Sequence, residues 1–331
     1  MADNGLLVLE GIRKYFPVRG GVMRRTRGLV RAVDGVSLSI GAGKTYGLVG
    51  ESGSGKTTLG RAAIMLEAPT AGSVVFDGRE LTSCQSEELR RFRVSMQMIF
   101  QDPFASLNPR MTVGAIVGEP LLIHARGSRA ERSRRVGELL SRVGLEPAHA
   151  SRYPHEFSGG QRQRIGIARA ISLNPKLIIC DEPVSALDVS IQAQIINLLA
   201  ELQEAFGIAY LFIAHNLAVV RHISRTIGVM YLGRLVEEAP SGELFAAPLH
   251  PYTRSLLAAV PRMEPRTERK RTLLGGTVPS PVSPPPGCAF HPRCPKGDES
   301  CRRVIPDLLE ISPGHRVACL KVKNGSSGSS G

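Results

Sequence analysis

The chain has no apolar run long enough to cross a bilayer. A membrane-spanning helix needs roughly 18 apolar residues in a row, whereas the longest candidate, 209–220, is broken by His215 and Asn216. At the start, Met1 to Asn4 bring no basic segment followed by an apolar stretch, so we expect no secretory signal. These absences predict a cytoplasmic protein.

The composition is that of an ordinary globular protein with an excess of basic residues. The 331 residues are 42% hydrophobic and 21% charged, which is enough for one large or two modest cores. A formal net charge of +13 indicates an acidic partner, which could be nucleic acid, an anionic membrane surface or nucleotide phosphate. Residues 324–331 are typical of an added Gly/Ser linker and carry no information about the fold.

Strand-like and helix-like segments alternate along much of the chain. The apolar segment Tyr46–Val49 runs through a Gly-rich turn into a predicted helix, Lys56–Ala63. A second buried strand, Leu177–Cys180, precedes a predicted helix from Ser190, its expected N-cap, to Phe206, with Gly207 as the C-terminal cap. Further buried strands are predicted at 210–214 and 227–232. This alternation predicts a parallel sheet covered on both faces.

Changes in composition indicate where the domains begin and end. Residues 102–175 lack strand-like runs and read as a helical subdomain inserted into an α/β core formed by 1–101 and 176–261. A charged and proline-rich linker is expected at 262–287, followed by a four-cysteine module at 288–323.

The segment Gly50–Thr57 matches the phosphate-loop pattern G-x-x-x-x-G-K-[ST] in full, between a predicted strand and a predicted helix. In such a loop successive N–H groups and the helix N-terminus face phosphate, Lys56 reaches the β- and γ-phosphates, and the Thr57 hydroxyl ligates Mg²⁺. The candidate ATP-binding residues are Gly50, Ser52, Gly53, Ser54, Gly55, Lys56, Thr57 and Thr58.

Two carboxylates follow the predicted strand at 177–180. The carboxyl end of a strand is where an open α/β sheet places ligand-binding groups. We expect Asp181 to hold Mg²⁺ through water, and Glu182 to polarise the attacking water as the catalytic carboxylate. Cys180 is expected to be a packing residue.

The pentapeptide Phe157–Gln161, placed before such a strand, resembles the signature motif of ATP-binding cassette (ABC) ATPases, with phenylalanine in place of the usual leucine. Ser158 can cap a helix that starts near Gly160. The resemblance covers about 7–261 and implies an α/β fold, a RecA-like P-loop ABC ATPase core with an inserted helical subdomain, here followed by a small C-terminal Cys-rich extension.

The resemblance also implies roles for further residues. Gln101 would contact Mg²⁺ and water, Asp188 would lie in the D-loop, His215 would contact the γ-phosphate, and Tyr15 would stack on adenine. In this family two cassettes pack head to tail around two ATP molecules. The signature residues therefore act on ATP bound by the other subunit; here they are Ser158, Gly159, Gly160 and Gln161.

Four cysteines lie near the C-terminus with the spacing C-x5-C-x6-C-x17-C: Cys288, Cys294, Cys301 and Cys319. In a cytosolic protein such a cluster favours metal binding over disulfides, but the spacing does not choose the metal. Residues 249–253 and 288–295 resemble the C-terminal extension of oligopeptide and dipeptide importer ATPases, some of which carry a [4Fe-4S] cluster there. That resemblance implies an iron–sulfur cluster; Zn²⁺ and unliganded thiols stay open.

The resemblance implies an ATP-hydrolysing subunit that powers import of di- or oligopeptides through a separate permease. It would lie peripherally at the cytoplasmic face of the inner membrane, with a second homologous ATPase subunit, two permease subunits and, indirectly, an extracytoplasmic substrate-binding protein. A soluble ABC ATPase acting on nucleic acid suits the charge, but the chain lacks the heptad-bearing inserts and the second cassette of such proteins. A redox sensor and an importer for glutathione or a metal chelate are further alternatives. The sequence leaves open the cargo and whether the ATPase pair is a homo- or heterodimer.

Overall fold

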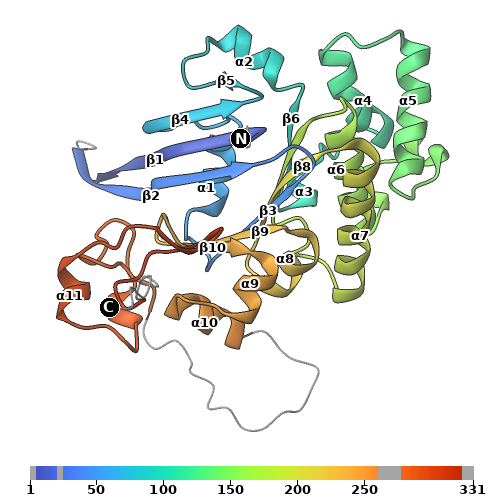
Figure 1. Ribbon diagram of the computed structural model, residues 1–331. Helices are drawn as coiled ribbons and strands as arrows, with labels where there is room; N and C mark the ends of the chain where they lie inside the picture. The colour runs from blue at the N-terminus through green and yellow to red at the C-terminus, as the bar shows by residue number, and fades with distance from the viewer. Residues whose placement is uncertain (1–4, 21–24, 260–276, 323–331) are drawn as a thin grey trace. The chain divides into compact units, whose positions relative to one another are not determined.

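The computed structural model describes residues 5–20, 25–259 and 277–322, and its contacts divide the chain into two units (Figure 1). Unit 1 comprises Met1–Leu6, Ile40–Thr45 and Phe76–Ile213; unit 2 comprises Leu7–Ser39, Tyr46–Val75 and Ala214–Gly331. Met1–Asn4, the expected core boundary at Pro261, most of the expected linker (262–276) and the added linker at 324–331 lie outside the described residues.

Three parallel strands form the sheet of unit 1. They are β6 (Met96–Ile99), β7 (Leu177–Asp181) and β8 (Ala209–Ala214), with β7 between the other two. Every residue of β7 and β8 is buried, as expected of a parallel sheet covered on both faces. Helix α7 (Val189–Phe206) ends at Gly207 in the left-handed conformation, as predicted. Its N-cap, however, is Asp188, so the prediction of Ser190 was wrong by two residues.

Residues 102–175 of unit 1, all of which are described, form helices and no strand. The helices are α3 (Pro103–Ser106), α4 (Val113–Ile123), α5 (Arg129–Arg142) and α6 (Gly159–Ile171), with 3₁₀ turns at Pro147–Ser151 and Pro154–Glu156. Helices α4, α5 and α6 pack on one another (Figure 1). Upstream lie β5 (Arg79–Glu80) and α2 (Ser86–Phe92). Among the described residues no helix combines the length and apolarity that crossing a membrane requires.

The larger sheet of unit 2 is mixed: the predicted strands at 46–49 and 227–232 pair in parallel as expected, but antiparallel strands that were not predicted extend the sheet. Strand β3 (Thr45–Val49) pairs in parallel with β9 (Thr226–Tyr231), but β10 (Arg234–Pro240) runs antiparallel to β9. Strands β12 (His315–Val317) and β11 (Leu309–Ser312) continue the antiparallel part. The reason is local, since the short turn after Tyr231 leaves no room for a crossover helix.

Unit 2 also holds strands of a second sheet, which the sequence motifs did not predict. Strand β1 (Leu7–Gly20) lies between β2 (Arg25–Ile40) and β4 (Ala71–Phe76). The helices of unit 2 include α1 (Lys56–Ala63) and α8 (Leu217–Ile223). This second sheet positions Tyr15 and Asp34, which are described below.

A fully buried carboxylate on β10 binds two later segments of the chain. Glu237, 0% exposed, accepts hydrogen bonds from the backbone N–H groups of Leu249 (2.6 Å) and His250 (3.0 Å), and its oxygen lies 2.8 Å from His315 Nε2. A buried carboxylate needs such partners to offset its desolvation. Glu237 therefore ties the strand β12 and the segment before α10 (Pro251–Ala258) to one point. The remaining elements of this region are α9 (Ser241–Ala246), the 3₁₀ turn His291–Arg293 and α11 (Glu299–Arg303).

Candidate functional site

The glycine-rich loop of unit 2 connects β3 to α1 and encloses the ammonium group of Lys56. Lys56 is 4% exposed, and its Nζ donates hydrogen bonds to the carbonyl oxygens of Gly50 (2.8 Å) and Glu51 (3.0 Å). Helix α1 starts at Lys56, as predicted, with Gly55 as an N-cap that offers no side-chain hydrogen bond and with no acidic residue in the first turn. Backbone N–H groups and a lysine gathered at a helix N-terminus suit a phosphate group.

Gly55 cannot be replaced without moving the loop. Its φ of 102° lies in the left-handed region, and a Cβ atom there would stand 1.9 Å from the carbonyl oxygen of Ala32. The next residue back, Ser54, is buried, and its carbonyl accepts a hydrogen bond of 2.9 Å from the N–H of Gly233. Ser52 and Gly53 are exposed, while Thr57 and Thr58 are partly buried on α1.

Sequence reasoning missed the contacts of Glu51, the second residue of this loop. Its carboxylate accepts two hydrogen bonds from the guanidinium of Arg293, at 2.7 and 3.0 Å. The hydrogen bond to Glu51 raises the pKa of Arg293 above its ordinary value. The two residues lie 242 positions apart, so no local pattern could have predicted the pair.

In unit 1 the two predicted carboxylates end strand β7. Asp181 is 2% and Glu182 7% exposed, and the Gln101 side-chain amide donates to Glu182 Oε2 at 2.7 Å. Glu182 has a φ of 49°, which is costly for a residue with a side chain, and its N–H is held by the carbonyl of Ile213 at 3.0 Å. Backbone strain fixed in this way is typical of functional positions. The structure therefore brings together Gln101 and Glu182, which the resemblance had placed at one site.

Two further predicted residues lie just before helices. His215 is exposed and directly follows β8, one position before Asn216, which caps α8 by accepting from the N–H of Ala218 at 2.9 Å. Asp188 is exposed at the start of α7, beside Val189, whose side chain is 81% exposed. Cys180 is fully buried, and burial raises the pKa of its thiol, in keeping with its predicted packing role.

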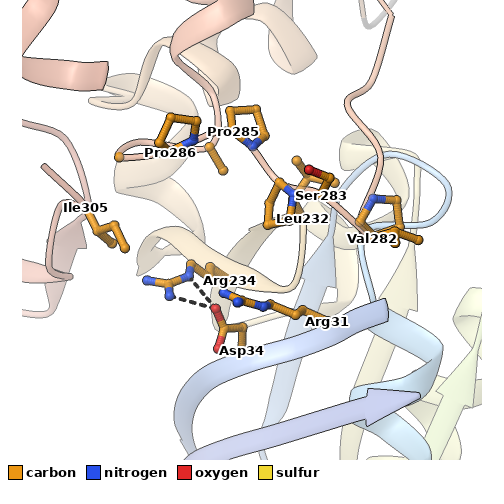
Figure 2. Close-up of a pocket in the computed structure, with 13 residues that line it drawn as sticks. Arg31, Asp34, Leu232, Arg234, Val282, Ser283, Pro285, Pro286 and Ile305 are labelled. Atoms are coloured by element: carbon orange, nitrogen blue, oxygen red, sulfur yellow. Dashed lines mark hydrogen bonds and ion pairs between the residues drawn. The ribbon is translucent and has the colours of Figure 1, made fainter. Parts of the chain in front are cut away.

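Tyr15 is held by a charged network in unit 2. Its hydroxyl donates to Asp34. The guanidinium of Arg234 donates to the same carboxylate at 2.6 and 3.0 Å (Figure 2). Burial acts to raise the pKa of Asp34, but the hydrogen bonds from Tyr15 and Arg234 outweigh it and leave that pKa below its usual value. The hydroxyl end of the Tyr15 ring is thus held in place. Such a fixed ring suits an aromatic residue that stacks on a nucleobase.

The same carboxylate borders a cavity of about 320 Å³ (Figure 2). Arg31, Asp34 and Arg234 line one side of it, and residues 281–287, from the end of the predicted linker, line the other. The carbonyl of Pro281 accepts a hydrogen bond of 3.2 Å from the N–H of Arg31. The described end of the predicted linker thus packs against β2.

The signature residues start helix α6 with a complete capping box. Ser158 Oγ accepts from the N–H of Gln161 (3.3 Å), and Gln161 Oε1 accepts from the N–H of Ser158 (3.0 Å). Ser158 and Gly159 are exposed, whereas Phe157 is buried with the Arg152 guanidinium 4.7 Å from its ring. A Cβ atom on Gly160 would stand 2.6 Å from Cγ2 of Ile191, so the absence of a side chain lets α6 approach α7 closely.

The four cysteines are reduced thiols in one small module. The N–H of Cys288 donates to the carbonyl of Cys301 at 2.8 Å. Burial first, and then the neighbouring Cys301, Cys319 and Cys294, raise the pKa of Cys288 to about 11. In the described parts of the chain, however, no three Cys, His, Asp or Glu side chains are grouped so that they could hold a metal ion. The cysteines thus gather without forming a ready ligand set.

Two family models match the chain. Residues 33–185 match the model described as "ABC transporter", and residues 236–301 match "Oligopeptide/dipeptide transporter, C-terminal region". The first match contains the phosphate loop, the signature motif and both carboxylates; the second contains Tyr252 and Arg293.

Curated proteins and solved structures agree with these matches. The chain is 56% identical to the oligopeptide transport ATP-binding protein AppF of Bacillus subtilis, over 95% of this chain and 96% of that protein. It is 50% identical to a putative peptide import ATP-binding protein of Brucella ovis, over 97% and 99%. A solved dimeric structure of the ATP-binding cassette MJ0796 bound to ADP and Pi is 31% identical, with a TM-score of 0.63, covering 71% of this chain and 98% of that one.

The close approach at Gly160 predicts a stability difference between two adjacent glycines. Gly160→Ala forces its Cβ into Ile191 and should lower the free energy of unfolding by about 1–3 kcal/mol, as overpacking does. Gly159→Ala is the matched control, because its Cβ would stand an ordinary 3.5 Å from Leu187. Urea unfolding of both variants compares them. Equal stability would contradict the assigned packing role of Gly160.

Proposed function

Since this chain belongs to the family of ABC transporter ATP-binding proteins, we propose that it hydrolyses ATP to power the import of peptides through a separate membrane permease. The reaction drives a conformational change: ATP binding closes a pair of cassettes, and hydrolysis reopens them. The proposed cargo is a peptide. Glutathione and metal chelates are the alternative cargoes within the same family.

The length of the alignment with a peptide transport protein supports peptides as the cargo. The likeness to an oligopeptide transport ATP-binding protein runs over 95% of the chain at 56% identity, so it includes the C-terminal region as well as the cassette. A cassette match alone would leave the transported substance open. The alternative of a soluble ABC ATPase acting on nucleic acid is not favoured, because the similar proteins named above are transport proteins.

We propose ATP and Mg²⁺ as the ligands of the predicted nucleotide-binding residues. Bound Mg²⁺ would neutralise charge on the β- and γ-phosphates; its proposed protein ligands are Thr57, Gln101 and Asp181. Lys56 and the N-terminus of α1 would hold the phosphates, and Tyr15 would stack on adenine. Glu182, oriented by Gln101, would position and deprotonate the attacking water, and His215 would contact the γ-phosphate.

The signature residues are proposed to complete an ATP site on a second cassette subunit. Ser158 and Gly159 are exposed at the N-terminus of α6, so they are accessible to an anion from outside the chain. We assign Asp188 to the D-loop beside that interface. The similar cassette MJ0796 was solved as a dimer bound to ADP and Pi, which supports this arrangement.

The permease would dock on the helical part of unit 1, whose proposed bounds as a subdomain are 102–175. Among the large apolar side chains that this segment exposes are Phe104 (65%), Leu122 (62%) and Ile123 (54%). This placement would put the subunit at the cytoplasmic face of the inner membrane, next to two permease subunits and indirectly to a substrate-binding protein.

For the C-terminal module we propose metal binding by Cys288, Cys294, Cys301 and Cys319, as a [4Fe-4S] cluster or, alternatively, Zn²⁺. Four soft thiol donors in one module support it. The described arrangement does not itself fit a metal, since it contains no group of three suitable side chains.

Glu182→Gln should keep ATP binding and lose turnover. The amide retains the shape of the carboxylate but cannot accept a proton, so phosphate release should fall by about 100-fold or more. Nucleotide binding should stay within about twofold. Glu201→Gln, at an exposed position on α7, serves as the control. Turnover at the wild-type rate in Glu182→Gln would refute its catalytic role.

Mixing two inactive variants tests whether the site is shared between subunits. Lys56→Ala should abolish nucleotide binding, and Ser158→Arg should retain binding but block turnover. In a mixed dimer one of the two sites combines an intact loop with an intact signature. Random pairing of equal amounts makes about half of the dimers mixed, so mixing should restore about a quarter of the wild-type turnover. Wild-type turnover that rises with the square of protein concentration establishes dimer formation beforehand. Without recovery under those conditions, the shared site is wrong.

Metal analysis of anaerobically purified protein tests the cysteine proposal. An iron–sulfur cluster should give a brown protein with broad absorption at roughly 400 nm, typical of thiolate-bound iron. Cys301→Ser should then lose that iron, whereas Cys84→Ser, outside the module, should keep it. A colourless protein with stoichiometric zinc would select the alternative, and four freely titrating thiols without metal would reject both.

A further inference from the structure

Two residues of the C-terminal region, Tyr252 and Arg293, form hydrogen bonds with Glu51 of the phosphate loop. We infer that Tyr252 and Arg293 are positioning residues of the ATP site: they hold Glu51, and through Glu51 they hold the Lys56 ammonium where phosphate binds. The inference rests on the proposed ATPase function but concerns residues that lie outside the ABC transporter match at 33–185.

Every polar group of Glu51 is engaged within unit 2. Its N–H donates to the hydroxyl oxygen of Tyr252 at 2.8 Å, and its carbonyl accepts from Lys56 Nζ at 3.0 Å. Its two carboxylate oxygens accept hydrogen bonds from the two terminal nitrogens of the Arg293 guanidinium. Backbone and side chain are thus fixed together, and the carbonyl that orients Lys56 cannot rotate without breaking the other bonds.

Arg293 is itself held rigidly. Its side chain is only 6% exposed, and its N–H donates to the carbonyl of Phe290 at 3.0 Å within a 3₁₀ turn. The guanidinium also lies 3.5 Å from the Tyr231 hydroxyl. A planar guanidinium that pairs with a carboxylate through two parallel bonds fixes orientation as well as charge, which a lysine would not do.

Tyr252 is fixed from the opposite side. His250 accepts a hydrogen bond from the Tyr252 N–H through Nδ1 at 3.0 Å, and burial lowers the pKa of His250 to about 3, so the imidazole is a neutral acceptor at pH 7. The Tyr252 ring packs against Tyr231 and Phe290, with centroids 4.8 and 5.4 Å away. Phe290 thereby joins the supports of Tyr252 and Arg293 into one cluster.

The physical consequence concerns ATP affinity. A loop rich in glycine has many alternative backbone conformations, and each one that misplaces Lys56 lowers the fraction of molecules able to bind phosphate. Removing Arg293 frees one end of Glu51 and leaves its carboxylate without its cationic partner. ATP binding should weaken by about 10-fold, a typical loss for one charge-assisted contact.

The experiment measures the dissociation constant of ATP for the full chain by fluorescence of a labelled ATP analogue, with thermal unfolding recorded in parallel. Arg293→Ala should weaken binding by about 10-fold, and Arg293→Lys should recover part of the loss. Glu51→Gln keeps the fold of the module and should weaken binding similarly. Combining Glu51→Gln with Arg293→Ala should add little further loss, because both act through one contact.

Arg303→Ala is the matched control, since it removes an exposed Arg–Glu pair from the same module and should leave ATP affinity unchanged. Wild-type affinity in folded Arg293→Ala or in Glu51→Gln would overturn the inference, as would additive losses in the double variant. The proposed function fails separately, if the wild-type chain neither binds nor hydrolyses ATP.

Discussion

A buried ammonium group in a glycine-rich loop is the constraint on which unit 2 depends. Lys56 is 4% exposed, and a charge so placed needs fixed acceptors. The acceptors are backbone carbonyls of the loop itself, Gly50 and Glu51, so the loop must keep one conformation for the lysine to stay in place. Much of the surrounding structure meets that need: Ala32 approaches Gly55, Gly233 binds Ser54, and the C-terminal region binds Glu51.

Short-range patterns predicted the parts of the site that short-range physics determines. Helix α1 has the predicted bounds because a phosphate loop ends where a helix N-terminus must begin. Strands β7 and β8 were predicted from continuous apolar runs, which only a sheet buried on both faces requires. Gln101 and Glu182 were assigned to one site by resemblance, and the 2.7 Å hydrogen bond between them confirms that they meet.

The errors and omissions have different physical origins. Asp188 and Ser190 are equally suitable N-caps by propensity, so local preference could not choose between them, and α7 begins after the earlier one. The antiparallel pairing of β10 with β9 follows from a turn too short for a crossover. The pair of Glu51 and Arg293 joins segments 242 residues apart, so only a folded chain can reveal it.

The turn that carries Arg293 gives the cysteine module a direct mechanical connection to the phosphate loop. It starts after Cys288, whose carbonyl accepts from the N–H of His291 at 2.9 Å, and it ends at Cys294, whose N–H donates to His291 at 3.2 Å. The guanidinium therefore sits on a turn bounded by two of the four cysteines. Phe290, which is 1% exposed, packs at the start of that turn against Tyr231 and Tyr252. The cysteine module and the phosphate loop are thus joined by one ion pair, that of Arg293 with Glu51, because the loop and the module must both fold before the two side chains can meet.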